Sequence, residues 1–279
     1  MSERTPPTPV RPSQTPDPLD DFTPRPFAFD GKTRTVFWKG SGPPVVVMHE
    51  IPGITPEVAE FARRIVDAGY TVVMPHLFGD PGRPYSDGYT AASIVRACIS
   101  REFLVLASRR SSPIVKWLRA LCREAHEHCG GPGVGALGMC LTGNFALAMM
   151  VDESVMAPVL SQPSLPFSLT PGLARGLHIS DEDLQIVKRR AQSGCPVLGL
   201  RMKGDWLMFG SRFERLQQEL GDGFIDGTVD LAGRPSVAPF AHSVLTTELR
   251  ADDPDHPTQA ALQAVLDLFD RQLRPAPQP

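Results

Sequence analysis

The chain has 279 residues, of which 42% are hydrophobic and 7% aromatic, and its 28 basic residues nearly balance its 31 acidic ones. This length suits one sizeable α/β domain or two small ones, and we expect one. The balanced charge excludes a field strong enough to hold nucleic acid or an acidic membrane surface. Small molecules are therefore the expected partners.

The cysteines argue against a structural framework of disulfides or metal. They are odd in number and show no CxxC or His-paired zinc spacing. The first residues contain no apolar stretch typical of a signal peptide, and no run of about 18 apolar residues could span a bilayer. We therefore expect a cytoplasmic protein, where thiols stay reduced. The cysteines are Cys98, Cys122, Cys129, Cys140 and Cys195.

Both ends of the chain are expected to be disordered. Residues 1–26 are dense in Pro, Thr, Ser and Asp, so they can bury little and their prolines block regular hydrogen bonding. A PxxP ligand for a partner domain is the weaker alternative for this tail. The prediction is a tail over 1–26, one domain over 27–274 and a disordered end over 275–279.

The first half of the domain alternates strands with helices. Thr33–Trp38 and Pro44–His49 are predicted strands, the second an almost unbroken apolar run that needs cover on both faces. Thr55 and Pro56 are the N-cap and first residue of a predicted helix that ends near Gly69. A buried strand, YTVVMP, follows, and then two helical segments, the second beginning SSPIVKWLRAL with Ser112 as its candidate cap.

The second half continues the alternation. The predicted strands are Val134–Leu137, Val155–Leu160, Pro196–Met202 and Phe224–Leu231. The predicted helices begin near Thr142, Ser180, Ser211 and Thr258. This pattern predicts an α/β fold with a mostly parallel sheet and helices on both faces.

The segment GALGMCLTGNFALAMM carries the strongest chemical signal. A short strand runs into Gly138-Met139-Cys140-Leu141-Thr142-Gly143 and then into a helix, which is typical of a nucleophile elbow. Such a turn holds its nucleophile in a strained conformation, so the residues two positions away must be small. The start of the following helix lowers a thiol pKa and favours an oxyanion. The alternative is an ordinary buried cysteine, since free cysteine is among the most buried residue types.

Three separated segments resemble the dienelactone hydrolase family: HEIPGITPEVAEFARRIVDAGYTVVMPHLFG, GALGMCLTGNFAL, and PVLGLRMKGD followed by FAHS. They span roughly residues 44 to 245. The resemblance implies an α/β-hydrolase fold and a triad in the chain order Cys, Asp, His, which Cys140, Asp205 and His242 satisfy. It also implies hydrolysis of cyclic enol esters without a metal or organic cofactor.

The acid and base of this triad rest on the resemblance as well as on position. Asp205 follows a predicted strand, and by itself would more simply be a turn-forming residue. His242 lies between the last predicted strand and the final helix, where a loop brings it over the nucleophile. Its rival, His256, lies in an acidic helix-start segment and is expected to be a solvated surface residue. His126 and His128 are expected at the surface near a helix end.

Further site residues follow from the resemblance. The oxyanion hole would combine the backbone N–H of Leu141 with that of Ile51, and Glu50 matches a family acid that faces the nucleophile. Two departures concern the substrate more than the fold: Thr142 stands where the family usually has glycine, and no arginine follows His242 at the common spacing. Arg101 could supply the missing positive charge to a substrate carboxylate, with a solvated surface residue as the alternative.

The sequence thus predicts a hydrolase that cleaves a small ester or lactone through an acyl-enzyme. A thioesterase or a broad carboxylesterase would use the same residues. The alternative from another class is a non-catalytic relative in which the pocket binds a ligand or Cys140 senses oxidants.

Overall fold

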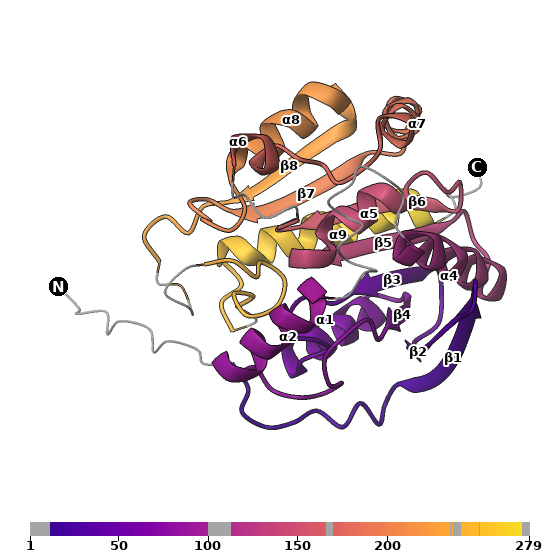
Figure 1. Ribbon diagram of the computed structural model, residues 1–279, viewed down its shortest axis with the longest axis vertical. Helices are drawn as coiled ribbons and strands as arrows, with labels where there is room; N and C mark the ends of the chain where they lie inside the picture. Colours follow the sequence, from indigo (N-terminus) through magenta and orange to yellow (C-terminus); the bar gives the residue numbers. More distant parts are fainter. Residues whose placement is uncertain are drawn as a thin grey trace.

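The computed structural model describes residues 12–99, 113–165, 170–234, 236, 241–250 and 252–274. Its centre is an eight-stranded sheet of order β1-β2-β4-β3-β5-β6-β7-β8 (Figure 1). The pairs β1–β2 and β2–β4 are antiparallel and the other five are parallel, which confirms the predicted mostly parallel sheet. The strands are β1 (Thr23–Phe29), β2 (Lys32–Lys39), β3 (Pro44–Met48), β4 (Thr71–Pro75), β5 (Val134–Met139), β6 (Val155–Ser161), β7 (Val197–Met202) and β8 (Phe224–Val229).

Helices cover both faces of the sheet, as predicted. The apolar residues of α1 (Pro56–Asp67) and α9 (Pro257–Leu273) belong to one buried cluster. Those of α4 (Pro113–Cys129), α5 (Gly143–Met149), α7 (Asp181–Gln192) and α8 (Gly210–Leu220) belong to a second cluster. The remaining helices are α2 (Asp87–Ile99), α6 (Pro171–Ala174) and the 3-10 turns η2 (Cys140–Thr142) and η3 (Gly221–Gly223).

Side-chain caps explain where two of the helices begin. The Thr55 hydroxyl accepts a hydrogen bond from the Val58 amide at 3.4 Å, and Pro56 occupies the first turn of α1. The Ser180 hydroxyl accepts from the Asp183 amide at 3.0 Å at the start of α7. Both caps agree with the sequence, whereas the predicted cap Ser112 lies outside the described residues.

The structure differs from the sequence prediction over residues 12–26. Leu19 and Phe22 are 4% and 3% exposed, and β1 begins at Thr23. Arg63 of α1 forms ion pairs with Asp17 at 2.7 Å and Asp21 at 2.8 Å. The prolines of this segment are tolerated because β1 is an edge strand, where a missing N–H need not break a ladder. Residues 1–11 and 275–279 lie outside the described part of the chain.

The parallel strands bring their carboxyl ends to one edge of the sheet, where ligands of α/β folds commonly bind. The segments leaving β3, β5, β6 and β7 at this edge carry Glu50, Cys140, Gln162 and Asp205. Among the described helices, none has the length and apolar character needed to cross a bilayer.

Candidate active site

Cys140 lies at the turn that links β5 to η2. Its φ is +50°, a left-handed conformation that costs a non-glycine residue about 1–3 kcal/mol. A Cβ on Gly138 would lie 2.2 Å from the carbonyl oxygen of Thr142, and one on Gly143 would lie 2.6 Å from Cα of Pro163. Both positions therefore need glycine. Gly138 lies two residues before Cys140, where a nucleophile elbow requires a small residue, whereas Gly143 lies three residues after it, beyond Thr142.

The turn accommodates Thr142, which the sequence analysis identified as a departure from glycine. The side chain is fully buried and its hydroxyl accepts a hydrogen bond from the Met139 amide at 2.9 Å. The same oxygen lies 3.0 Å from the carbonyl of Met48 and 3.2 Å from that of His49. It also lies 2.9 Å from the carbonyl of Met139. The single hydroxyl proton can serve one of these three carbonyls, and the side chain lies between the elbow and the end of β3.

The side chains of Asp205 and His242 form a short hydrogen bond at this edge of the sheet. The distance from Asp205 Oδ2 to His242 Nδ1 is 2.6 Å, and the Asp205 side chain is 1% exposed. The other carboxylate oxygen accepts from the amides of Leu207 at 2.9 Å and Met208 at 3.3 Å. A carboxylate fixed in this way keeps the Nδ1 proton of His242 in place and directs Nε2 away from Asp205.

The second nitrogen of His242 faces Cys140 and Ser164. Nε2 lies 3.4 Å from Ser164 Oγ, and Cys140 interacts electrostatically with the same ring. Burial by itself would lower the pKa of His242, but the thiol group of Cys140 and the carboxylate of Asp205 together raise that pKa well above 6.5. The arrangement therefore favours the protonated form of the His242 ring.

Cys140 differs from the other described cysteines, all of which are free thiols. Burial raises the pKa of Cys122 and of Cys195, and both side chains are buried. Burial also raises the pKa of Cys129, which is partly exposed. Cys140 is partly exposed and contacts a histidine, which makes it the described cysteine best suited to act as a nucleophile.

Glu50 is a buried carboxylate surrounded by uncharged donors. It is 5% exposed; Oε2 accepts from Ser243 Oγ at 2.8 Å and Gln162 Nε2 at 3.1 Å, and Oε1 accepts from Thr246 Oγ1. Burial raises the pKa of Glu50, opposed by these hydrogen bonds and by the nearby His242. The sequence predicted that Glu50 faces the nucleophile, whereas its hydrogen bonds run to the loop that carries His242 and to Gln162.

The proposed oxyanion donors reach the same edge by the register of the sheet. Met48 of β3 pairs with Gly138 of β5, and Ile51 and Leu141 each lie three residues beyond this pair. Leu141 is the second residue of η2, where an amide has no acceptor within the helix. Both side chains pack against the same apolar cluster as Cys140.

The remaining sequence-predicted residues have different outcomes. His256 is 6% exposed, so the expectation of a solvated residue is wrong. Its Nδ1 accepts from the Thr258 amide as the N-cap of α9. His128 is exposed, as expected. Arg101 lies outside the described residues.

Several polar residues of the site were not singled out from the sequence. Gln162 and Ser164 follow β6, and their position after a buried strand was the one available signal. Ser243 and Thr246 follow His242 by one and four residues. Because the residue types are common and no motif joins these pieces, only the folded arrangement brings them together.

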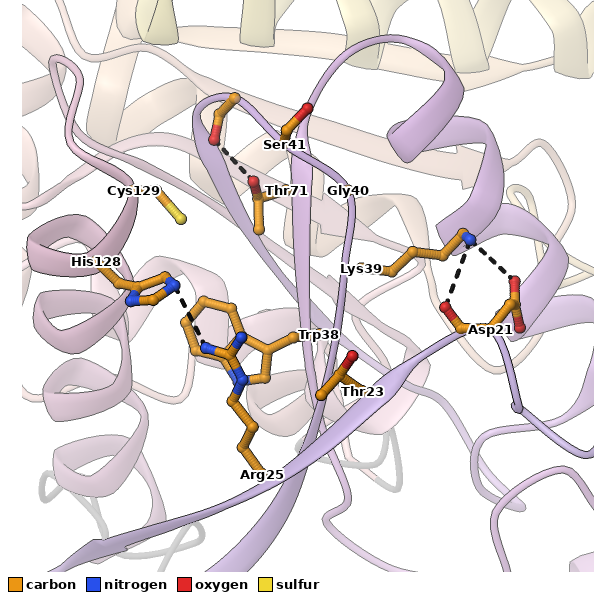
Figure 2. A pocket seen from close by; sticks show the side chains of 11 residues that line it. Asp21, Thr23, Arg25, Trp38, Lys39, Gly40, Ser41, Thr71, His128 and Cys129 are labelled. Carbon is orange, nitrogen blue, oxygen red and sulfur yellow. Dashed lines mark hydrogen bonds and ion pairs between the residues drawn. The ribbon is translucent and has the colours of Figure 1, made fainter.

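A separate polar pocket of about 480 Å³ lies at the opposite end of the sheet (Figure 2). It is lined by Thr71 at the start of β4, Cys129 at the end of α4, and Trp38. The Arg25 guanidinium stacks 5.1 Å from the Trp38 ring, and its NH1 lies 3.3 Å from His128 Nε2. These contacts, at the negative end of α4, account for Arg25 without a ligand. Over the ranges that the structure describes, no group of three His, Cys, Asp or Glu side chains could hold a metal ion.

Comparisons with known proteins agree with this architecture. A model of the dienelactone hydrolase family matches residues 32–230, so the match ends before His242. A search of curated proteins finds no match. Among solved structures, a putative dienelactone hydrolase from Klebsiella pneumoniae is 19% identical, with a TM-score of 0.58 over 90% of this chain and 98% of that one.

Other solved structures share the fold at similar distance. A dienelactone hydrolase-like promiscuous phosphotriesterase from metagenomic libraries is 17% identical, with a TM-score of 0.55 over 91% of this chain and 99% of that one. A thioesterase domain from the curacin biosynthetic pathway is 13% identical, with a TM-score of 0.51 over 88% and 99%. At these identities the likeness supports the fold alone.

Proposed function

Because the chain belongs to the dienelactone hydrolase family, we propose that it cleaves a small ester or lactone with Cys140, His242 and Asp205 through an acyl-enzyme. One observation carries the proposal. Nδ1 of His242 lies 2.6 Å from Asp205 Oδ2, and the same ring interacts electrostatically with Cys140, whose backbone is held at a φ of +50°. Nucleophile, base and orienting acid are therefore in the order that this chemistry requires.

In the first half of the reaction the Cys140 thiolate attacks the ester carbonyl carbon. The new carbon–sulfur bond moves an electron pair onto the carbonyl oxygen, and the amides of Leu141 and Ile51 donate hydrogen bonds to it. As the oxyanion collapses, the carbon–oxygen bond breaks and His242 gives its Nε2 proton to the leaving oxygen. In a lactone the leaving group stays attached to the acyl-enzyme.

In the second half water replaces the leaving group. His242 takes a proton from water through Nε2 as the water oxygen attacks the thioester carbon. The tetrahedral species collapses, the carbon–sulfur bond breaks, and the carboxylic product leaves. Asp205 keeps Nδ1 protonated throughout, so the ring alternates between acid and base without turning.

The proposal also specifies the charge of the substrate. We propose that Arg101 binds the carboxylate of an anionic substrate, which would otherwise be unpaired because no arginine follows His242 at the spacing common in the family. Arg101→Met should then raise KM selectively for an anionic ester over a neutral ester of equal reactivity. Equal effects on both esters, or none, would contradict this assignment.

The hydrolase assignment is tested with a panel of lactones, aryl esters and thioesters, using wild type and Cys140→Ala. Wild type should turn over at least one class, and Cys140→Ala should reduce turnover by orders of magnitude. Mass spectrometry of the quenched reaction should find an acyl group on Cys140. Full activity of Cys140→Ala would contradict the proposed nucleophile, and ligand binding without turnover would favour the non-catalytic binder or thiol sensor.

A further inference from the structure

Gln162 is a buried polar residue in an unusual backbone conformation. It follows β6, its exposure is 0%, and its φ is +35°. Glutamine has no special tolerance of this left-handed region, so the conformation costs free energy that surrounding contacts must offset. Its amide donates to the Leu200 carbonyl of β7 at 2.6 Å, which anchors the residue to the sheet.

The side chain of Gln162 joins two segments of the site. Nε2 donates to Glu50 Oε2 at 3.1 Å, and Oε1 accepts from the Val244 amide at 3.4 Å and from Ser161 Oγ. Val244 lies two residues beyond His242. The position thus requires a side chain that donates to a carboxylate and accepts from an N–H, and a primary amide does both.

The main chain of Gln162 is connected to His242 through Ser164. Its carbonyl accepts from Ser164 Oγ at 2.9 Å, and that oxygen lies 3.4 Å from His242 Nε2. The Ser164 amide donates to the carbonyl of Cys140 at 2.9 Å. Because Ser164 uses its hydroxyl proton for Gln162, its lone pairs are left to accept from the imidazolium.

Glu50 completes the support of the loop that carries His242. Its carboxylate accepts from Ser243 and Thr246, one and four residues after the base, and from Gln162. Glu50, Gln162 and the 243–246 segment therefore form one hydrogen-bonded unit, in which Gln162 has contacts on both sides of His242.

We propose that Gln162 is a positioning residue that holds His242 against Cys140 through Glu50, Val244 and Ser164. This inference rests on the proposed function. A displacement of the base by about 1 Å can cost on the order of 100-fold in rate, so loss of the Gln162 amide should lower kcat with little change in KM. The effect should also be visible in the nucleophilicity of Cys140, since His242 controls its proton.

The first test replaces the amide by groups of nearly the same size. Gln162→Leu removes donor and acceptor, and should lower kcat about 10- to 100-fold. Gln162→Glu keeps the acceptor for the Val244 amide but places a second carboxyl group next to that of Glu50. Two carboxyl groups at this distance share one proton, so Gln162→Glu should lose activity as pH rises and recover it as pH falls.

The second test exchanges the two partners. Glu50→Gln and Gln162→Glu are each expected to impair kcat, and the double variant should recover most of the loss. In the exchanged pair the amide at 50 donates one N–H to the carboxylate at 162, which still accepts from Val244 and Ser161. The other N–H of this amide faces Ser243 Oγ, whose hydroxyl must turn from donor to acceptor. A loss in the double variant that is smaller than the sum of the two single losses measures the coupling between the two side chains.

Ser180→Ala is the matched control, because removing the cap of α7 should lower the stability of the fold modestly without reaching the site. Far-UV circular dichroism verifies folding, and iodoacetamide alkylation of Cys140 across pH reports the base even if no ester is hydrolysed. Gln162 variants should slow alkylation and change its pH profile, as His242→Ala does, while Ser180→Ala should match wild type. A wild-type pH profile for Gln162→Glu, or a double variant no better than the single variants, would overturn the inference. A wild type that is alkylated normally but hydrolyses nothing would contradict the proposed function alone.

Discussion

Cys140 differs in two respects from a cysteine that is buried only for packing. The backbone adopts a φ of +50° between two glycines that have no room for a Cβ, and the thiol lies against a histidine fixed by a carboxylate. Strain of this kind persists only where the surrounding structure supports it, as functional sites do. The chemistry of a thiol should therefore matter at this position as well as its size.

Cys140→Ser is expected to lose most of the activity although it keeps a nucleophile. A serine hydroxyl stays protonated near neutral pH, so it cannot form the ion pair with His242 that the raised pKa of the histidine favours. Steady-state kinetics on the best ester of the panel measure the loss. Turnover comparable to wild type would show that the site is not adapted to a thiol.

The two histidines of the last third of the chain should separate function from stability. His242→Ala should depress turnover by orders of magnitude with little loss of stability, because the side chain belongs to a loop at the sheet edge. His256→Ala removes the N-cap of α9 and should cost about 1 kcal/mol of unfolding free energy, with kcat unchanged. Urea unfolding and steady-state kinetics test both, and an exchange of the two phenotypes would identify His256 as the base.

The sequence could predict some site residues better than others for physical reasons. Cys140 stands in a turn in which Gly138 and Gly143 have no room for a side chain. Such a pattern can be recognised within one short segment of the sequence. Gln162 and Ser164 act through contacts with residues 112 and 78 positions away, Glu50 and His242. Because no local pattern encodes partners at that separation, these roles become visible only in the folded chain.

At the scale of elements, the sequence failed to predict the edge strand β1, although it predicted the opposite edge strand β8. β1 has prolines at positions 24 and 26, and its residues are mostly exposed, so neither apolar alternation nor propensity favours a strand. It forms because β2 offers a free edge for antiparallel pairing, and the missing N–H groups are tolerated there. The central strands β3 and β4 are buried throughout, and their apolar runs predicted them correctly.

Arg63 connects α1 to the segment before β1 and should make this packing sensitive to acid. Hydrogen bonds from its guanidinium lower the pKa of Asp17 and of Asp21 below 3.8. Since both folded pKa values are depressed, the stabilisation is present above the ordinary carboxyl pKa and is lost as pH falls through the depressed values.

Arg63→Met should therefore lower the unfolding free energy near neutral pH by a larger amount than near pH 2. Urea unfolding at both pH values measures the difference. Arg64→Met is the control on the same helix, because Arg64 pairs at 3.1 Å with Glu60, which is 56% exposed, and such a surface pair contributes little. Equal losses for the two variants at every pH would contradict a special role for Arg63.

At the scale of the whole molecule, the sheet collects residues from distant parts of the chain at one edge. The family match covers residues 32–230, while the proposed base is His242 and the segment that packs on α1 precedes residue 32. The alternation of strands and helices predicted the layered fold, because each buried parallel strand needs cover on both faces. The same reasoning missed residues 12–22, whose burial depends on two apolar side chains among many polar ones.

The last prediction concerns that N-terminal segment. Deleting residues 2–22 removes Leu19 and Phe22, which are 4% and 3% exposed. Burial of such a side chain contributes about 1.5–3 kcal/mol to the unfolding free energy. The deletion also leaves Arg63 without Asp17 and Asp21 and without the Phe22 ring, which lies 5.4 Å from its guanidinium. We therefore expect a loss of several kcal/mol in unfolding free energy and a clear drop in Tm.

Deleting residues 2–11 is the matched control, since this proline-rich stretch has little apolar surface to bury and should leave Tm nearly unchanged. Both deletions keep the triad and should retain the alkylation rate of Cys140 while folded, measured well below the Tm of the shorter chain. A deletion of 2–22 with the Tm of the full chain would show that the segment adds no stability. An equal fall for the two deletions would instead assign the stabilisation to residues 2–11.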